Sequence, residues 1–151
     1  MDKSHIDTLI ARWTKQGVGL NPGASDEQFN QAEARLGIRF PDDVREFYRA
    51  CNGFDTRSMD DELNSFLSVE EIDTVEAITK GHPGAGVGDS NLVIIDHCIW
   101  ARLMVCRLTD SRDNPAPVSW NDGGNPTQIR PSFGDFIELY AKDPEAVLRD
   151  Y

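Results

Sequence analysis

The chain has 151 residues, 39% of them hydrophobic and 27% charged, which is typical of a globular protein large enough to form one domain with a sizeable core. Its net charge of −11 argues against nonspecific binding to nucleic acid or anionic membranes, because such surfaces bind through lysine and arginine. No apolar run approaches the roughly 18 residues of a transmembrane helix, and the acidic, amphipathic start of the chain is unlike a signal peptide.

A first helix is expected from Ser4, as its N-cap, to about Gln16. Ile6, Leu9, Ile10 and Trp13 share one side of it at helical spacing. A turn at residues 21–23 separates this helix from the next one.

Two further helices are joined by a short connector, so they form a defined corner. The first begins at a capping box of Ser25 with Gln28 and ends at Gly37, which lacks the Cβ that disfavours a left-handed residue. The second begins at Pro41, whose missing N–H costs nothing in a first helical turn, and ends at Asn52-Gly53.

The second half of the chain is rich in strand patterns. Strands are expected at residues 63–67, 92–95, 99–108, 117–120 and 127–130. Ser68 with Glu71 predicts a capping box that opens a helix containing Val69 and Ile72. A C-terminal helix begins after Ser132, and a last short one begins near residues 143–145.

This order of elements predicts the fold class. Helices come first, then consecutive strands, then helices again. We therefore expect a single α+β domain over residues 1–151, with a central, largely antiparallel sheet flanked by N-terminal and C-terminal helices.

The corner carries residues that resemble a family pattern, in which an acidic helix ends in Leu-Gly and a Pro-led helix ends in Asn-Gly. The matching residues are Glu33, Leu36, Gly37, Pro41, Phe47, Asn52 and Gly53. Residues 66–72 look like the strand-to-helix step of that family, and residues 131–137 look like its C-terminal Ser-Phe-x-x-Phe helix. The family is the SUKH superfamily, the Smi/Knr-like proteins of bacterial toxin immunity and fungal cell-wall regulation. The resemblance spans roughly residues 22–142 and departs from the pattern at residues 79–91.

The resemblance implies a function without catalysis. We expect a protein-binding domain similar to an immunity protein that neutralises a polymorphic or contact-dependent toxin, such as a nuclease, by blocking it. The alternative is a regulatory scaffold or adaptor of the cell-wall-assembly type. Either role implies a protein partner and no cofactor.

Residues capable of catalysis or metal binding form no recognisable motif. The cysteines, Cys51, Cys98 and Cys106, and the histidines, His5, His82 and His97, lack the paired spacing of a zinc site. There is no Gly-x-Ser-x-Gly elbow. The acidic pairs at residues 42–43 and 70–71 fall in predicted first helical turns, where capping and the helix dipole explain them. We therefore expect no catalytic residue and no metal.

Residues 81–89 are glycine-rich and raise a third hypothesis, a hydrolase or nucleotide-binding protein. A phosphate-binding loop precedes a helix and, in the P-loop, ends in Gly-Lys-Ser/Thr. This segment precedes an expected strand and has no lysine after its glycines. We interpret it as a connector, and whether it binds a ligand stays open.

Most of the negative charge is concentrated in one stretch. Residues 55–76 contain eight acidic residues against Arg57 alone, a net charge of −7. These candidate partner-binding residues are Asp55, Asp60, Asp61, Glu62, Glu70, Glu71, Asp73 and Glu76. Such a stretch is either a solvated face or a docking surface for a basic partner, and the sequence leaves both open.

A basic toxin domain would fit such a docking surface. Trp100, Trp120 and Phe54 are candidate hydrophobic anchors, although each is equally compatible with the core. We expect no nucleic-acid or membrane partner, and a monomer or weak dimer. Three cysteines without a disulfide framework favour a reducing cytoplasm.

Overall fold

A computed structural model describes residues 2–55, 58–81, 88, 90–122 and 125–149. Within this part of the chain the helices are α1 (Lys3–Lys15), α2 (Asp26–Leu36), α3 (Asp42–Ala50), α4 (Val75–Lys80), α5 (Phe133–Lys142) and α6 (Ala146–Arg149). The strands are β1 (Asn64–Phe66), β2 (Asp73–Thr74), β3 (Ser90–His97), β4 (Arg102–Leu108), β5 (Val118–Asp122) and β6 (Asn125–Arg130).

The strands form one antiparallel sheet in the order β1-β3-β4-β5-β6, which confirms the predicted α+β class. The short strand β2 also pairs with β3, along the same edge as β1. Phe66 of β1 lies opposite Ile95, whereas Asp73 of β2 lies opposite Val93. The chain from β1 to β2 therefore returns to the same strand, and residues 67–72 connect the two pairings.

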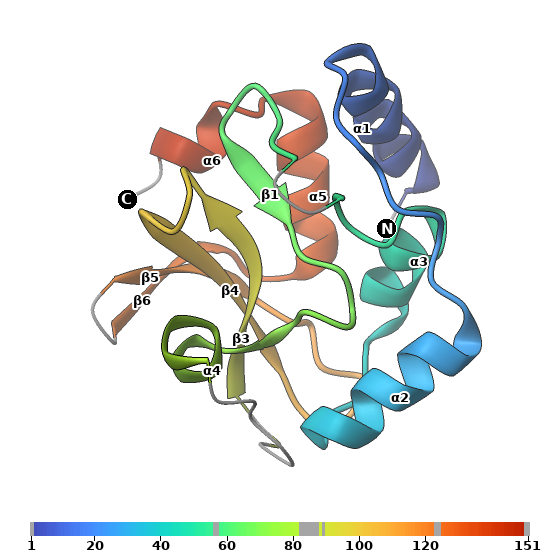
Figure 1. The fold of residues 1–151 in the computed structure, drawn as a ribbon, viewed down its shortest axis with the longest axis vertical. Helices are drawn as coiled ribbons and strands as arrows, with labels where there is room; N and C mark the ends of the chain where they lie inside the picture. The colour runs from blue at the N-terminus through green and yellow to red at the C-terminus, as the bar shows by residue number, and fades with distance from the viewer. Residues whose placement is uncertain (1, 56–57, 82–87, 89, 123–124, 150–151) are drawn as a thin grey trace.

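Most helices lie on one side of the sheet. Figure 1 shows α1, α2 and α3 along one side of the molecule, with α5 between α1 and the sheet and α4 on the opposite side. The apolar side chains Phe133, Phe136, Ile137 and Tyr140 of α5 are fully buried. This agrees with an amphipathic helix that packs on a sheet through one face.

The core is centred on Trp13 of α1. Its ring centroid lies 4.8 Å from that of Phe54 and 5.2 Å from that of Phe66. Phe66 in turn lies 5.1 Å from Phe47 of α3 and 5.8 Å from Tyr140 of α5. Packed rings at these separations gain more than their buried area alone. The first helix, the corner and strand β1 are therefore joined through one aromatic cluster.

The local signals at helix ends were mostly predictive. Ser25 and Gln28 form the expected capping box, and Gly37 ends α2 in the left-handed conformation. Ser132 caps α5 by accepting a hydrogen bond from the Asp135 N–H. The cap of the first helix was predicted wrongly: Asp2, and not Ser4, is the N-cap of α1.

The prediction of a helix that begins after Ser68 is also wrong. The Ser68 N–H donates to Glu71 Oε1, as in a capping box, but the chain makes a turn and α4 begins only at Val75, capped by Thr74. The backbone carbonyls that a helix would use, such as that of Val69, instead accept hydrogen bonds from Arg35. A side chain from α2 thus replaces the next helical turn.

Candidate functional site

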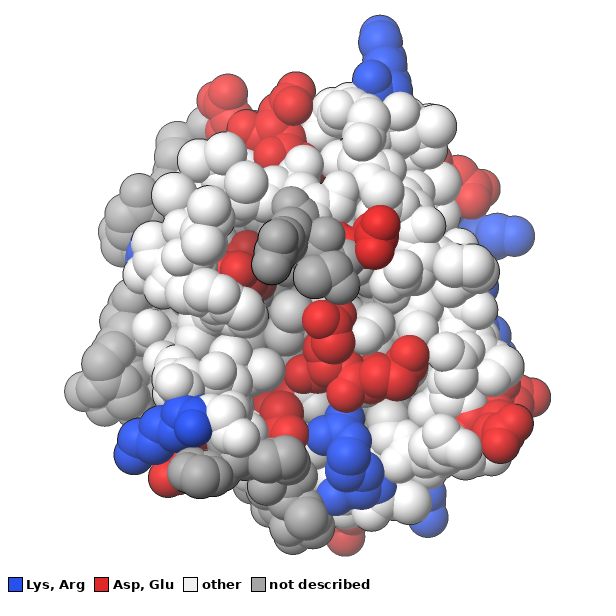
Figure 2. Space-filling model, viewed as in Figure 1, with Lys and Arg blue, Asp and Glu red and all other residues white. Residues whose placement is uncertain are grey.

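The structure divides the eight candidate acidic residues into two groups. Asp60 and Asp73 are buried, with only 4% and 7% of their surface exposed. The other six are partly or fully exposed: Asp55, Asp61, Glu62, Glu70, Glu71 and Glu76. Figure 2 shows acidic side chains gathered in the middle of the face that carries β1 and α4. Arg57, the basic residue of this stretch, lies outside the described residues.

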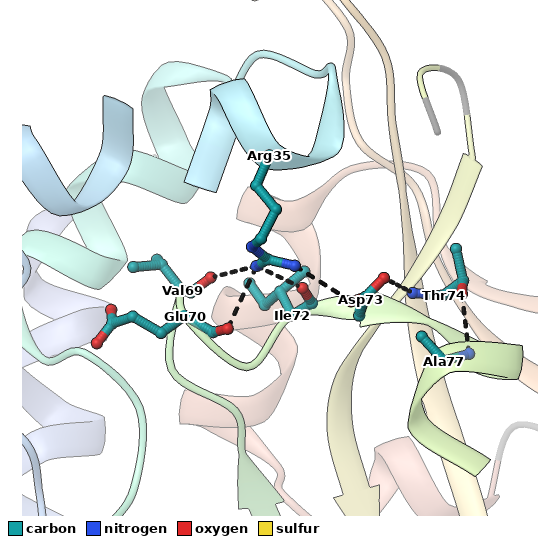
Figure 3. Close-up of polar contacts among 7 residues, drawn as sticks. All are labelled: Arg35, Val69, Glu70, Ile72, Asp73, Thr74 and Ala77. Carbon is teal, nitrogen blue, oxygen red and sulfur yellow. Dashed lines mark hydrogen bonds and ion pairs between the residues drawn. The ribbon is translucent and has the colours of Figure 1, made fainter. Parts of the chain in front are cut away.

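A single arginine fixes the shape of the segment that carries Glu70. Arg35 of α2 forms an ion pair with Asp73 at 3.1 Å and donates to the carbonyl of Ile72 at 2.9 Å. It also donates, at 3.3 Å each, to the carbonyls of Val69 and Glu70. Figure 3 shows these groups converging on the guanidinium while the Glu70 carboxylate points away from it. Asp73 therefore pairs its negative charge with Arg35 inside the domain, whereas the Glu70 carboxylate does not contact Arg35.

The Asn-Gly end of the corner positions the same segment from its other side. The side chain of Asn52 accepts a hydrogen bond from the Val69 N–H and donates one to Glu70 Oε1, both at 2.9 Å. Gly53 has a φ of +73°, and a Cβ there would lie 2.7 Å from the Leu67 carbonyl. The close contact thus requires glycine at position 53, and Asn52 orients the Glu70 carboxylate.

Asp60 belongs to a buried polar network. Its Oδ2 accepts hydrogen bonds from Trp13 Nε1 at 3.2 Å and from the Tyr140 hydroxyl. Its Oδ1 accepts from the backbone N–H groups of Glu62 and Asn64, both at 3.0 Å. Burial raises the pKa of Asp60, and these hydrogen bonds oppose that rise. Asp60 therefore ties its loop to α1 and α5 and is not an open surface carboxylate.

Glu62 is intermediate between the two groups. Its Oε2 is buried and accepts no hydrogen bond from the described residues. Burial, followed by the neighbouring charge of Asp60, raises its pKa. Glu62 therefore contributes less outward negative charge than an open carboxylate such as that of Asp61.

A pocket of about 410 Å³ lies against the acidic residues. It is lined by Phe54, Asp55, Met59, Ser65, Leu67, Glu71, Asp96, Ile99 and Trp100. The side chains of Met59, Ile99 and Trp100 are 36%, 71% and 54% exposed. Large apolar side chains gathered at a surface hollow are characteristic of binding sites.

The turn between β3 and β4 displays two of these apolar residues. Cys98, Ile99 and Trp100 have φ angles of 55°, 54° and 68°, which L-residues rarely adopt, least of all a β-branched one. The turn is held by the Cys98 N–H, which donates to Leu63 O at 2.8 Å, and by the Trp100 N–H, which donates to Asp96 Oδ1 at 2.5 Å. Strained backbone of this kind is frequent at functional sites.

The three predicted hydrophobic anchors, like the acidic residues, divide into buried and exposed side chains. Trp120 is fully buried and donates a hydrogen bond from Nε1 to Val147 O at 3.1 Å, so it belongs to the core. Phe54 is 2% exposed and forms part of the floor of the pocket. Trp100 alone of the three is largely open to solvent.

The sequence profile of the SMI1 / KNR4 family (SUKH-1) matches residues 23–139. The chain belongs to this family. The matched residues include the corner, the Arg35-held segment and the lining of the pocket. Comparison with curated proteins gave no match. The family consists of domains of an immunity or regulatory type, and this SUKH-1 domain is of that general type.

Two of the three cysteines of the SUKH-1 domain are buried and poorly suited to act as nucleophiles. Burial raises the pKa of Cys51 to about 11 and that of Cys106 further, which disfavours the reactive thiolate at both. Cys98 is exposed. His97 Nδ1 lies 2.8 Å from Asn64 Oδ1, and burial lowers the pKa of this histidine.

The described part of the SUKH-1 domain contains neither a metal-binding cluster nor a membrane-spanning helix. No group of three or more metal-binding side chains occurs within it. None of its helices combines the length and the apolar composition needed to cross a bilayer. Of the glycine-rich segment 81–89, residues 82–87 and 89 lie outside the described residues, so the nucleotide-binding hypothesis gains no structural argument.

Proposed function

We propose that this SUKH-1 domain is a non-enzymatic immunity protein that neutralises one toxin by covering the toxin's active site. The family supplies the general type, and the acidic face supplies the partner class. A toxin that acts on nucleic acid presents a cationic site, because it must bind phosphate. A protein with fixed surface carboxylates is suited to occupy such a site.

One observation carries the proposal: two adjacent carboxylates are held at the surface in defined positions. Glu70 is oriented by Asn52 and also accepts from Gln28 Nε2 at 3.3 Å. Glu71 accepts from the Ser68 N–H at 2.9 Å. Carboxylates fixed before binding lose less conformational entropy on association than mobile ones do. Charge of one sign on such a face also accelerates association with a cationic partner.

The same proposal includes location and state. Cys51, Cys98 and Cys106 are free thiols, which suits a reducing cytoplasm, where an immunity protein would meet an imported toxin. We place the protein there as a monomer that forms a one-to-one complex, and basic toxin domains are the partners that its charge favours.

A regulatory scaffold is the second candidate, and one observation favours it. A separate polar hollow between α1 and α3 is lined by Lys3, Asp42, Arg45, Glu46, Arg49, Ala50 and Arg112. A scaffold needs more than one binding face, and this hollow differs in charge from the acidic face. The scaffold role predicts several partners of moderate affinity.

The immunity role predicts a toxin domain encoded beside the gene, and co-expression with that domain tests the role. We expect this protein to restore growth of cells that produce the toxin and to co-purify with it at one-to-one stoichiometry. Replacing Glu70 and Glu71 together by Gln should weaken protection, because Gln keeps the hydrogen-bond acceptor and loses the charge. Unrestored growth, together with several weaker partners captured from the host, would favour the scaffold.

A further inference from the structure

The pocket combines two kinds of wall. One wall is apolar and exposed, formed by Met59, Ile99 and Trp100. The other carries carboxylates, including those of Glu71 and Asp96. We propose that this pocket receives one arginine side chain of the protein partner. The inference rests on the proposed function in that the occupant belongs to a protein.

The two carboxylates are oriented before any cation binds. Glu71 uses Oε1 to accept the Ser68 N–H, and Asp96 uses Oδ1 to accept the Trp100 N–H, so each is oriented by a backbone donor. Neither forms an ion pair with any of the described basic residues. No lysine or arginine is among the described residues that line the pocket. The described lining of the pocket therefore has local negative charge that an incoming cation would balance.

The apolar wall explains why the cation belongs to a long, flat side chain. A partly exposed indole such as that of Trp100 attracts a cation placed over its face. Met59 and Ile99 offer apolar surface to the methylene stem of the same side chain. The domain already contains such a pair, since the guanidinium of Arg102 lies 3.9 Å from the ring centre of Trp120.

Arginine fits these walls better than lysine or an apolar side chain. Its planar guanidinium is weakly hydrated, stacks on aromatic rings and donates two parallel hydrogen bonds to a carboxylate. A lysine ammonium is more strongly hydrated and makes a point contact. An apolar side chain would leave Glu71 and Asp96 desolvated without a partner, which is costly.

The test uses the isolated protein and small blocked amino acids as probes. Nα-acetyl-arginine amide is titrated into ¹⁵N-labelled protein and followed by heteronuclear NMR. We expect saturable shifts, with a dissociation constant in the millimolar range, at the backbone amides of Ser65, Leu67 and Ile99 and at the Trp100 indole. The lysine analogue should bind several-fold more weakly, and the neutral citrulline analogue should cause no saturable shift.

Isosteric variants locate the charge. Glu71→Gln and Asp96→Asn each keep the acceptor oxygen for the backbone N–H, so the local fold should persist, and each should weaken arginine-amide binding several-fold. Trp100→Ala should do the same through the loss of the ring. Asp113→Asn is the matched control, because it removes one exposed negative charge outside the pocket and should leave binding unchanged.

Several outcomes would overturn the assignment. These are equal binding of the citrulline or lysine analogue, shifts that map away from the pocket, and the absence of saturation. Much tighter binding of free L-arginine than of the blocked amide would point to a metabolite and contradict a protein side chain. Because no toxin is present, failure here leaves the growth-protection result intact. Loss of protection would likewise leave this measurement intact.

Discussion

At the scale of single residues, two identical neighbours have opposite roles. Asp60 is buried and accepts hydrogen bonds from Trp13, Tyr140 and two backbone N–H groups, whereas Asp61 is exposed and its backbone N–H donates to Gln16 Oε1. The sequence Asp-Asp contains no signal that separates them, since burial here depends on α1 and α5, which are distant in the chain.

This difference predicts unequal effects on stability. Asp60→Ala leaves buried donors of Trp13 and the loop without an acceptor and should lower the free energy of unfolding by about 2–4 kcal/mol. Asp61→Ala, the adjacent control, should change it by no more than about 0.5 kcal/mol. Urea denaturation of both variants measures the contrast. Equal effects would show that the buried network does not hold the loop.

The buried carboxyl also predicts a pH dependence. Burial raises the pKa of Asp60 above its ordinary value of 3.8, so the folded protein binds this proton more tightly than the unfolded chain does. The contribution of Asp60 to stability is therefore largest below pH 3.8 and is lost as the pH rises through the raised pKa. Asp60→Asn cannot ionise and lacks this dependence.

The unfolding free energy of the wild-type protein, taken relative to that of Asp60→Asn, should consequently be higher below pH 3.8 than at neutral pH. Urea denaturation at several pH values measures this difference. A gap that stays constant, or that widens toward neutral pH, would mean that the carboxyl of Asp60 is not destabilised by burial.

At the scale of elements, local chemistry was predictable and long-range contacts were not. The capping box at Ser25 and the cap at Ser132 involve residues within one helical turn, so the sequence alone identified them. The helix predicted after Ser68 failed because its carbonyls are bound by Arg35, more than 30 positions earlier. A similar local signal was thus overridden by one tertiary contact.

The Arg35 contacts predict a stability effect specific to this segment. Arg35→Ala removes one partly buried ion pair and three hydrogen bonds to carbonyls, and should cost about 2–3 kcal/mol. Arg49→Ala removes an exposed ion pair with Asp26 and should cost no more than about 1 kcal/mol. Thermal and urea denaturation compare the two. A cost for Arg35→Ala no larger than that of the control would refute its role in fixing residues 69–73.

Two variants in the strained turn between β3 and β4 distinguish effects on stability from effects on binding. Cys98→Gly and Ile99→Gly each place glycine at a positive φ, so each should leave stability unchanged or raise it by about 1 kcal/mol. Only Ile99 lines the pocket, so only Ile99→Gly should also weaken arginine-amide binding. Calorimetry with the NMR titration distinguishes the two variants. Marked destabilisation by Ile99→Gly would show that its exposed side chain supports the turn.

At the scale of the whole molecule, folding gathers acidic side chains on one face (Figure 2). The sequence showed only that these residues belong to one stretch of the chain. The α+β class followed from the order of helices and strands, because such patterns are local. The pocket did not, since it requires Phe54 and Glu71 to meet Asp96 and Trp100 across the pairing of β1 with β3. Of its exposed apolar residues, Trp100 alone was a sequence candidate, and nothing marked it as exposed.

The proposed function depends on fixed surface carboxylates that bind a cationic protein, and the association rate with that partner tests it most directly. We would measure this rate by stopped-flow fluorescence at low and high salt, for the wild-type protein and for the double variant Glu70→Gln, Glu71→Gln. The wild-type rate should fall steeply as salt increases, and the variant should associate more slowly with a weaker salt dependence. Equal rates and equal salt dependence for the two proteins would contradict the account.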